Sequence, residues 1–123
     1  MAKTILIVDD SASLRVVVKI ALVRAGYDVI EAGDGKEGLA ALEKAGKVNL
    51  IVSDVNMPRM DGIAFVTQVN QHARHKFIPV IMLTTEGRDE KKNQGRAAGA
   101  KASMVKPFNP PQLLDAVPKL ILP

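Results

Sequence analysis

The 123 residues are 47% hydrophobic and only 3% aromatic, with no cysteine, which predicts one domain with an aliphatic core and excludes disulfides, thiolate metal sites and cysteine nucleophiles. The net charge is +4, but the 17 Lys and Arg are spread among 13 Asp and Glu and stacking rings are scarce, which favours an acidic protein partner over nucleic acid. No run approaches the roughly 18 to 20 apolar residues of a membrane span, so we expect a cytoplasmic protein with no membrane partner.

The start of the chain predicts a strand followed by a helix that is apolar on two sides. The aliphatic run Thr4 to Val8 is typical of a strand buried on both faces, and it ends at Asp9 and Asp10. Ser11 is the predicted N-cap of a helix over about 12–25. The expected core face contains Leu14, Val17, Val18, Ala21 and Leu22, and the opposite side carries Val16, Ile20 and Val23 beside Arg15, Lys19 and Arg24. This second stripe is either a surface for a partner or a contact with the last helix.

The rest of the chain continues the alternation of strands and helices. The further predicted strands are Asp28 to Ala32, Asn49 to Asp54, Pro79 to Thr84, and Lys101 to Val105. The first of these is more polar than the others, so we expect it at a sheet edge. The further predicted helices are Lys36 to Ala45, Ile63 to Gln71, a weakly apolar segment of about Arg88 to Ala98, and a last helix that begins at Asn109 and Pro110.

Five strand and helix pairs in succession predict an α/β fold with one parallel sheet and helices on both faces, joined by right-handed crossovers. The matching small doubly wound order is 2-1-3-4-5, with the first and third strands as neighbours. We expect one domain over residues 1–123 and five helices. In such sheets ligands bind at the carboxyl ends of the strands.

Four of the predicted strands end at a residue that can do chemistry. The residues are Asp9 and Asp10, Asp54, Thr84, and Lys106. Carboxylates on neighbouring strand ends repel one another unless a cation lies between them, and oxygen ligands of this kind suit Mg²⁺. Lys106 and Thr84 could hold a phosphoryl group, and Asp54 on the central strand is the expected nucleophile of an acyl phosphate. Taken singly, each residue could be a cap, a turn residue or an ion-pair partner.

The two histidines lie away from this edge. His72 and His75 fall at the end of the third predicted helix or just after it. We expect both to be solvated surface residues.

Together these residues carry a resemblance to a known family. Asp9-Asp10, Asp54 followed by Met57-Pro58 and Asp61-Gly62, Thr84, and Lys106-Pro107 resemble the receiver domain of two-component response regulators. The resemblance covers nearly the whole chain and is greatest with the single-domain chemotaxis (CheY-like) class. It implies a flavodoxin-like fold and a monomer that works as a phosphoacceptor signalling protein rather than as an enzyme.

The resemblance also implies roles for individual residues. Asp54 would accept phosphate from a histidine kinase or a histidine phosphotransfer protein. Asp10, Asp54 and the backbone carbonyl of Asn56 would hold Mg²⁺, with Asp9 acting through water. Thr84 and Lys106 would grip the phosphoryl oxygens. The output would be phosphorylation-dependent binding of a protein target such as the flagellar motor.

One position departs from the family pattern, and three other functions stay open. Ser103 stands three residues before Lys106, where the family usually has an aromatic residue that couples the site to the output face. The fold is shared by flavin-binding flavodoxins, although Asp9 and Asp10 would repel a flavin phosphate. A haloacid dehalogenase type of hydrolase would have a second Asp where this chain has Asn56. Within the favoured class, the alternative is a phosphate sink or phosphorelay intermediate.

Overall fold

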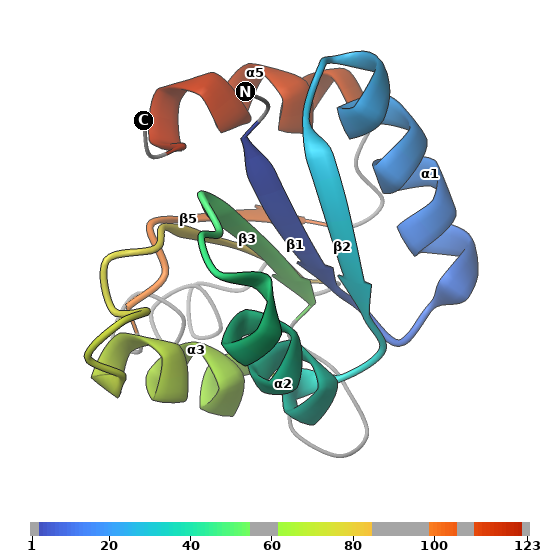
Figure 1. Cartoon of the computed structure of the whole chain (residues 1–123). Coiled ribbons are helices and arrows are strands. Elements are labelled where there is room, and N and C mark those ends of the chain that lie inside the picture. Colours follow the sequence, from blue (N-terminus) through green and yellow to red (C-terminus); the bar gives the residue numbers. More distant parts are fainter. Residues whose placement is uncertain (1–2, 55–61, 85–98, 106–109, 122–123) are drawn as a thin grey trace.

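The computed structural model describes residues 3–54, 62–84, 99–105 and 110–121, and these form one five-stranded parallel sheet with helices on both faces (Figure 1). The strands are β1 (Thr4–Val8), β2 (Asp28–Ala32), β3 (Leu50–Asp54), β4 (Val80–Thr84) and β5 (Ala102–Val105), in the order β2-β1-β3-β4-β5. The helices are α1 (Ala12–Arg24), α2 (Gly35–Ala45), α3 (Gly62–Gln71) and α5 (Pro110–Leu120). The predicted α/β fold, strand order and edge position of β2 are confirmed, and the predicted helix at 88–98 lies outside the described residues.

Two apolar layers hold the sheet, because successive residues of a buried strand point to opposite faces. α2 and α3 cover one face of the sheet, and α1 and α5 cover the other (Figure 1). Leu6 and Val8 of β1 pack in the layer with α2 and α3, whereas Ile5 and Ile7 pack in the layer with α1 and α5. Every residue of β3 and β4 is buried. None of the described helices is long and apolar enough to cross a membrane.

The ends of the first two helices follow the rules of capping. The Ser11 hydroxyl accepts a hydrogen bond from the backbone N–H of Leu14 at 3.2 Å, and the Asp34 carboxylate accepts one from Glu37 at 2.9 Å. Each bond satisfies a backbone donor that has no partner inside its helix. Gly26 follows α1 at φ 97°, a value that favours glycine.

The prediction that Val17 belongs to the core is wrong, because its side chain is 51% exposed. The buried stripe of α1 is centred on Val18 and Leu22, and consecutive helical residues are turned by about 100° from one another. Val17 therefore lies with the second stripe. Val16, Val17, Ile20 and Val23 are each about half exposed and form what we call the α1 apolar patch.

His75 is the second correction, since only 4% of this residue is exposed. It lies in the turn after α3, where its backbone N–H bonds to the carbonyl of His72 at 3.1 Å. Burial, followed by the charge of His72, lowers the pKa of His75, so its ring is neutral at pH 7. The neighbouring Glu43 carboxyl has a lowered pKa, chiefly because Arg74 donates a hydrogen bond to it.

Phe65 of α3 is fully buried and packs closely against α2. A Cβ atom at Gly38 would lie 2.9 Å from Cε1 of Phe65 and 3.1 Å from Cγ2 of Val8. Both neighbours are fully buried core side chains, so neither can move away without disturbing the packing around it. Gly38 thus sets how closely α2 approaches the sheet.

Gly38→Ala is expected to lower the free energy of unfolding by about 1 kcal/mol, within a net range of about 0–2 kcal/mol. Alanine favours a helix over glycine by about 0.8–1 kcal/mol, but overpacking a core costs about 1–3 kcal/mol. Denaturant unfolding measures the difference. Ala40→Gly on the exposed side of the same helix is the control for helix propensity alone. A more stable Gly38→Ala variant would contradict the close approach.

Candidate functional site

The order of the strands brings three carboxylates together at the carboxyl edge of the sheet. β1 and β3 are parallel neighbours with Val8 opposite Ser53, so the next residues along the two strands, Asp9 and Asp54, reach adjacent positions. Carboxylate oxygens of Asp9, Asp10 and Asp54 all lie within 4.8 Å of one another. The sequence-predicted acidic cluster is therefore present in the folded chain.

The cluster is partly removed from water. Asp9 is 1% exposed and Asp54 3% exposed, whereas Asp10 is exposed. Two carboxylates at this separation repel by about 3 kcal/mol at an effective dielectric constant of about 20, and burial adds a cost for each charge. A divalent cation offsets both costs. Because every donor is oxygen and Asp10 leaves one side open to water, the donor set fits Mg²⁺.

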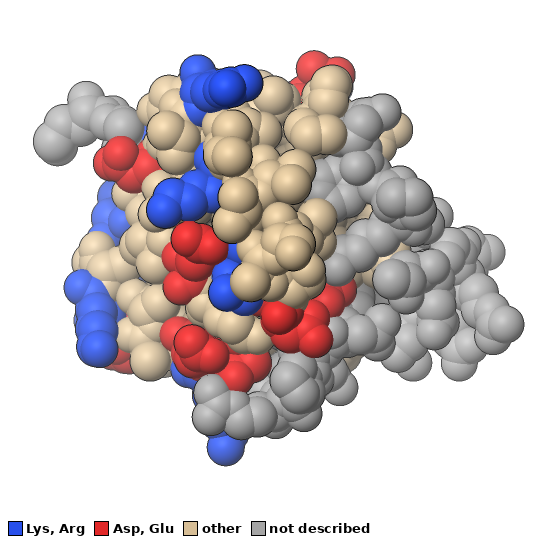
Figure 2. All heavy atoms as spheres, turned by 90° about the vertical axis from the view of Figure 1, so that its right-hand side faces the viewer, with Lys and Arg blue, Asp and Glu red and all other residues tan. Residues whose placement is uncertain are grey.

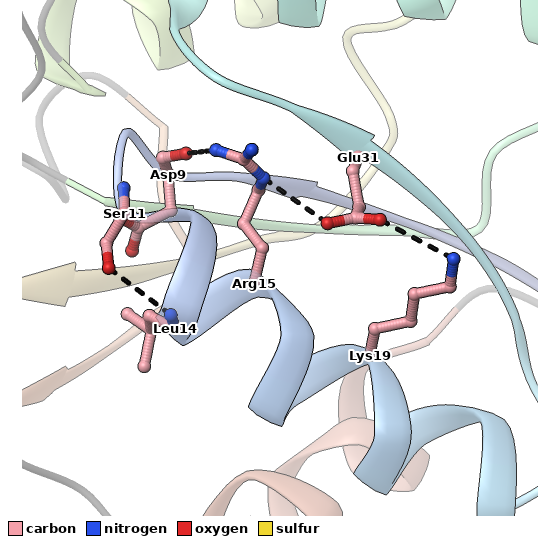
Figure 3. A network of polar contacts seen from close by, with 6 residues as sticks. All are labelled: Asp9, Ser11, Leu14, Arg15, Lys19 and Glu31. Carbon is pink, nitrogen blue, oxygen red and sulfur yellow. Dashed lines mark hydrogen bonds and ion pairs between the residues drawn. The ribbon is translucent and has the colours of Figure 1, made fainter.

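A polar network fixes the backbone of this acidic loop (Figure 3). The Asp9 carboxylate accepts the N–H of Ser11 at 2.9 Å, and the Arg15 guanidinium donates to the Asp9 backbone carbonyl. Arg15 also donates to Glu31 of β2 at 3.3 Å, and Lys19 donates to the other oxygen of Glu31 at 3.5 Å. The guanidinium therefore ties the loop after β1 to the edge strand.

Sequence reasoning placed Arg15 only on the rim of α1 and missed this positioning role. The position of Arg15 in the sequence could have indicated this role. Arg15 lies one turn into a helix capped by Ser11, where a long side chain can reach back to the preceding loop. No sequence pattern identified Glu31 as its partner, because the predicted strand order does not give the register or the position of α1 that brings the two side chains together.

Thr84 is the next site residue, and it is buried at the carboxyl end of β4. Asp54 pairs in register with Leu83, so Thr84 lies one residue further toward the site edge. Ser103 lies within β5 opposite Met82. Asn56 and Lys106 lie outside the described residues, and their assigned roles stay predictions. The described part of the site thus consists of three carboxylates and a neighbouring hydroxyl, a set able to bind a cation and to supply an oxygen nucleophile.

Comparisons with known proteins agree with this arrangement. The response regulator receiver domain family matches residues 5–118. Chemotaxis protein CheY1 of Helicobacter pylori is 40% identical over 112 residues, which cover 90% of either chain. The solved structure of the chemotaxis response regulator CheY4 of Vibrio cholerae is 46% identical, with a TM-score of 0.92, and the match covers 98% of this chain and 99% of that one.

The same module also occurs in a protein with a different output. The alkaline phosphatase synthesis transcriptional regulatory protein PhoP of Bacillus subtilis is 42% identical over 110 residues, which cover 89% of this chain but 45% of that protein. The fold, the acidic cluster and the family match lead to one conclusion. The chain belongs to the family of response regulator receiver domains, the phosphoacceptor modules of two-component signalling, and is CheY-like within that family.

Proposed function

We propose that this protein accepts a phosphoryl group on Asp54 from a histidine kinase or a histidine phosphotransfer protein, in a reaction that needs Mg²⁺. The observation that carries the proposal is the acidic cluster of Asp9, Asp10 and Asp54, two of whose carboxylates are buried. Receiver domains generally depend on Mg²⁺. The protein then acts as a signalling phosphoacceptor, not as an enzyme that turns over an external substrate, and its CheY-like relatives support a role in chemotaxis.

The proposed transfer uses the end of β3 as its centre. An Asp54 carboxylate oxygen attacks phosphorus, the bond from phosphorus to the donor imidazole nitrogen breaks, and the imidazole leaves and takes up a proton. Mg²⁺, held by Asp10 and Asp54 with Asp9 acting through water, would neutralise charge on the carboxylates and the phosphoryl oxygens. Thr84 at the neighbouring strand end would donate a hydrogen bond to the transferred group.

Asp54→Asn is expected to take no label from a small phosphodonor such as acetyl phosphate in the presence of Mg²⁺. The amide is a poor nucleophile and carries no charge for the cation. Asp115→Asn on the exposed side of α5 is the matched control and should label like the wild type. Labelling of Asp54→Asn at a comparable rate would assign the nucleophile to another residue.

Asp10→Ala is expected to stabilise the Mg²⁺-free protein and, at the same time, to abolish its phosphorylation. Without Mg²⁺ the variant should melt at a higher temperature than the wild type, because one of three repelling carboxylates is gone. With Mg²⁺ it should gain little stability and should not be phosphorylated, whereas the wild type is stabilised by binding. Thermal unfolding and labelling measure the two effects. Phosphorylation of the wild type in excess chelator would exclude the proposed role of the metal.

The surface that receives the phosphodonor is proposed to include the α1 apolar patch. The donor imidazole must reach Asp54, so its protein has to sit around this edge of the sheet, and α1 begins two residues after Asp10. The face that carries α1 is turned to the viewer in Figure 2, where uncharged surface is bordered by Lys and Arg and also by Asp and Glu. An exposed apolar patch with a charged rim is typical of a protein interface.

Val16→Asp combined with Ile20→Asp is expected to slow phosphotransfer from the cognate histidine-containing donor by tenfold or more, which corresponds to about 1.4 kcal/mol. Labelling by acetyl phosphate and denaturant unfolding should stay close to wild type, because both side chains are half exposed. Ala40→Asp on α2 is the control for added charge elsewhere. Unchanged transfer from the protein donor would place docking on another surface.

A further inference from the structure

A second group of metal-ligating side chains lies at the opposite edge of the sheet from Asp54. It consists of Glu43, near the end of α2, and of His72 and His75, which follow α3. α2 and α3 lie side by side on one face of the sheet (Figure 1). His75 stands five residues before β4 begins, so the cluster is at the amino ends of the strands. The phosphoryl-transfer site at the carboxyl ends makes no use of these residues.

The distances from Glu43 to the two imidazoles match the spacing of ligand atoms around a metal ion. Oε1 of Glu43 lies 3.2 Å from Nε2 of His72 and 3.5 Å from Nε2 of His75. Ligand atoms around a tetrahedral Zn²⁺ with bonds of about 2.0–2.1 Å stand about 3.3–3.4 Å apart. Nε2 of His75 is buried and makes no hydrogen bond in the described part of the chain. The 3.5 Å contact with Glu43 is too long for a good hydrogen bond, so a bound ion would satisfy this buried nitrogen better.

The carboxylate is also held as a metal ligand would be. Arg74 contacts Oε2 of Glu43 through its guanidinium, which leaves Oε1 facing the two imidazoles. Ligating carboxylates commonly bind a metal through one oxygen while a hydrogen-bond donor orients the other. A cavity of about 290 Å³ lined by His75 and Arg74 opens beside the cluster on the side of His75, and it is large enough to hold water.

We propose that Glu43, His72 and His75 form a binding site for a divalent transition metal ion such as Zn²⁺. Two imidazole nitrogens and one carboxylate oxygen are a donor set that suits Zn²⁺ and not Mg²⁺. An ion in this position would cross-link α2 to the segment that leads into β4. The site is separate from the acidic cluster in both place and chemistry.

Binding requires one ring to turn. The two imidazoles are stacked with centroids 4.1 Å apart and planes 23° apart, and the lone pair of each Nε2 lies in its ring plane. Nearly parallel rings at this spacing cannot both aim at one ion. His75 is held by burial, whereas the His72 side chain is 36% exposed and can rotate about its Cβ–Cγ bond. The rotation gives up the 3.1 Å bond that His72 Nδ1 accepts from the Arg74 backbone N–H.

Titration of the full chain with Co²⁺ and with Zn²⁺, in excess Mg²⁺, tests the site. We expect one equivalent of Co²⁺ to give the visible absorption of a tetrahedral ion, Zn²⁺ to displace it, and Zn²⁺ to raise the melting temperature. The ring resonances of His72 and His75 should shift together in a ¹⁵N-correlated NMR spectrum. Absence of the tetrahedral spectrum and of a stoichiometric Zn²⁺ isotherm would overturn the proposal.

Variants locate the ion. His72→Ala and Glu43→Gln change side chains at the surface, so both variants should fold and accept phosphate on Asp54 as the wild type does. Both should bind Zn²⁺ at least about a hundredfold more weakly, because loss of a direct ligand should cost more than the 10–100-fold cost of losing an outer hydrogen-bond partner. Asp10→Ala should bind Zn²⁺ like the wild type. Zn²⁺ binding that survives in His72→Ala and Glu43→Gln but is lost in Asp10→Ala would assign the ion to the acidic cluster and overturn the site.

Discussion

Repulsion among Asp9, Asp10 and Asp54 is the constraint on which the functional part of this structure depends. A parallel sheet places the ends of neighbouring strands at one edge, and the pairing of β1 with β3 brings the three carboxylates within 4.8 Å of one another. Two of the three, Asp9 and Asp54, are buried, which adds a cost for removing their charges from water. The unfavourable charge is balanced by the rest of the fold, and a bound cation and phosphoryl group can relieve it. Free energy stored as repulsion in this way makes ligand binding favourable.

The scaffold that withstands this repulsion is a sheet with apolar packing on both faces. Strands β1, β3 and β4 are almost entirely buried, with aliphatic side chains directed alternately to α1 and α5 and to α2 and α3. Arg15 adds a polar tie from the acidic loop to β2 through Glu31. Packing of this density leaves little freedom to the strand ends, so the core fixes Asp54, and the hydrogen bonds of Ser11 and Arg15 fix the loop that carries Asp9.

The two edges of the sheet differ in the chemistry of their donors. The carboxyl edge gathers oxygen atoms only, which suits Mg²⁺, whereas the amino edge gathers two imidazole nitrogens and one carboxylate oxygen. Each group draws residues from separate elements, and each contains a buried member, Asp54 at one edge and His75 at the other. Two ions could therefore bind the same domain without competing for ligands.

The sequence by itself determined the order of elements, the parallel sheet and the residues at the strand ends. Short aliphatic runs bounded by turn residues, such as the one that ends at Asp54, favour buried strands, and topology rules then bring Asp9, Asp10 and Asp54 together. Tertiary structure alone decided the exposure of Val17, the burial of His75 and the partners of Arg15. α1 is apolar on nearly every side, so periodicity could not show which side meets the sheet. The environments of His75 and Arg15 are formed by Glu43 and Glu31, and pairings between residues far apart in sequence arise only when the elements that carry them pack together.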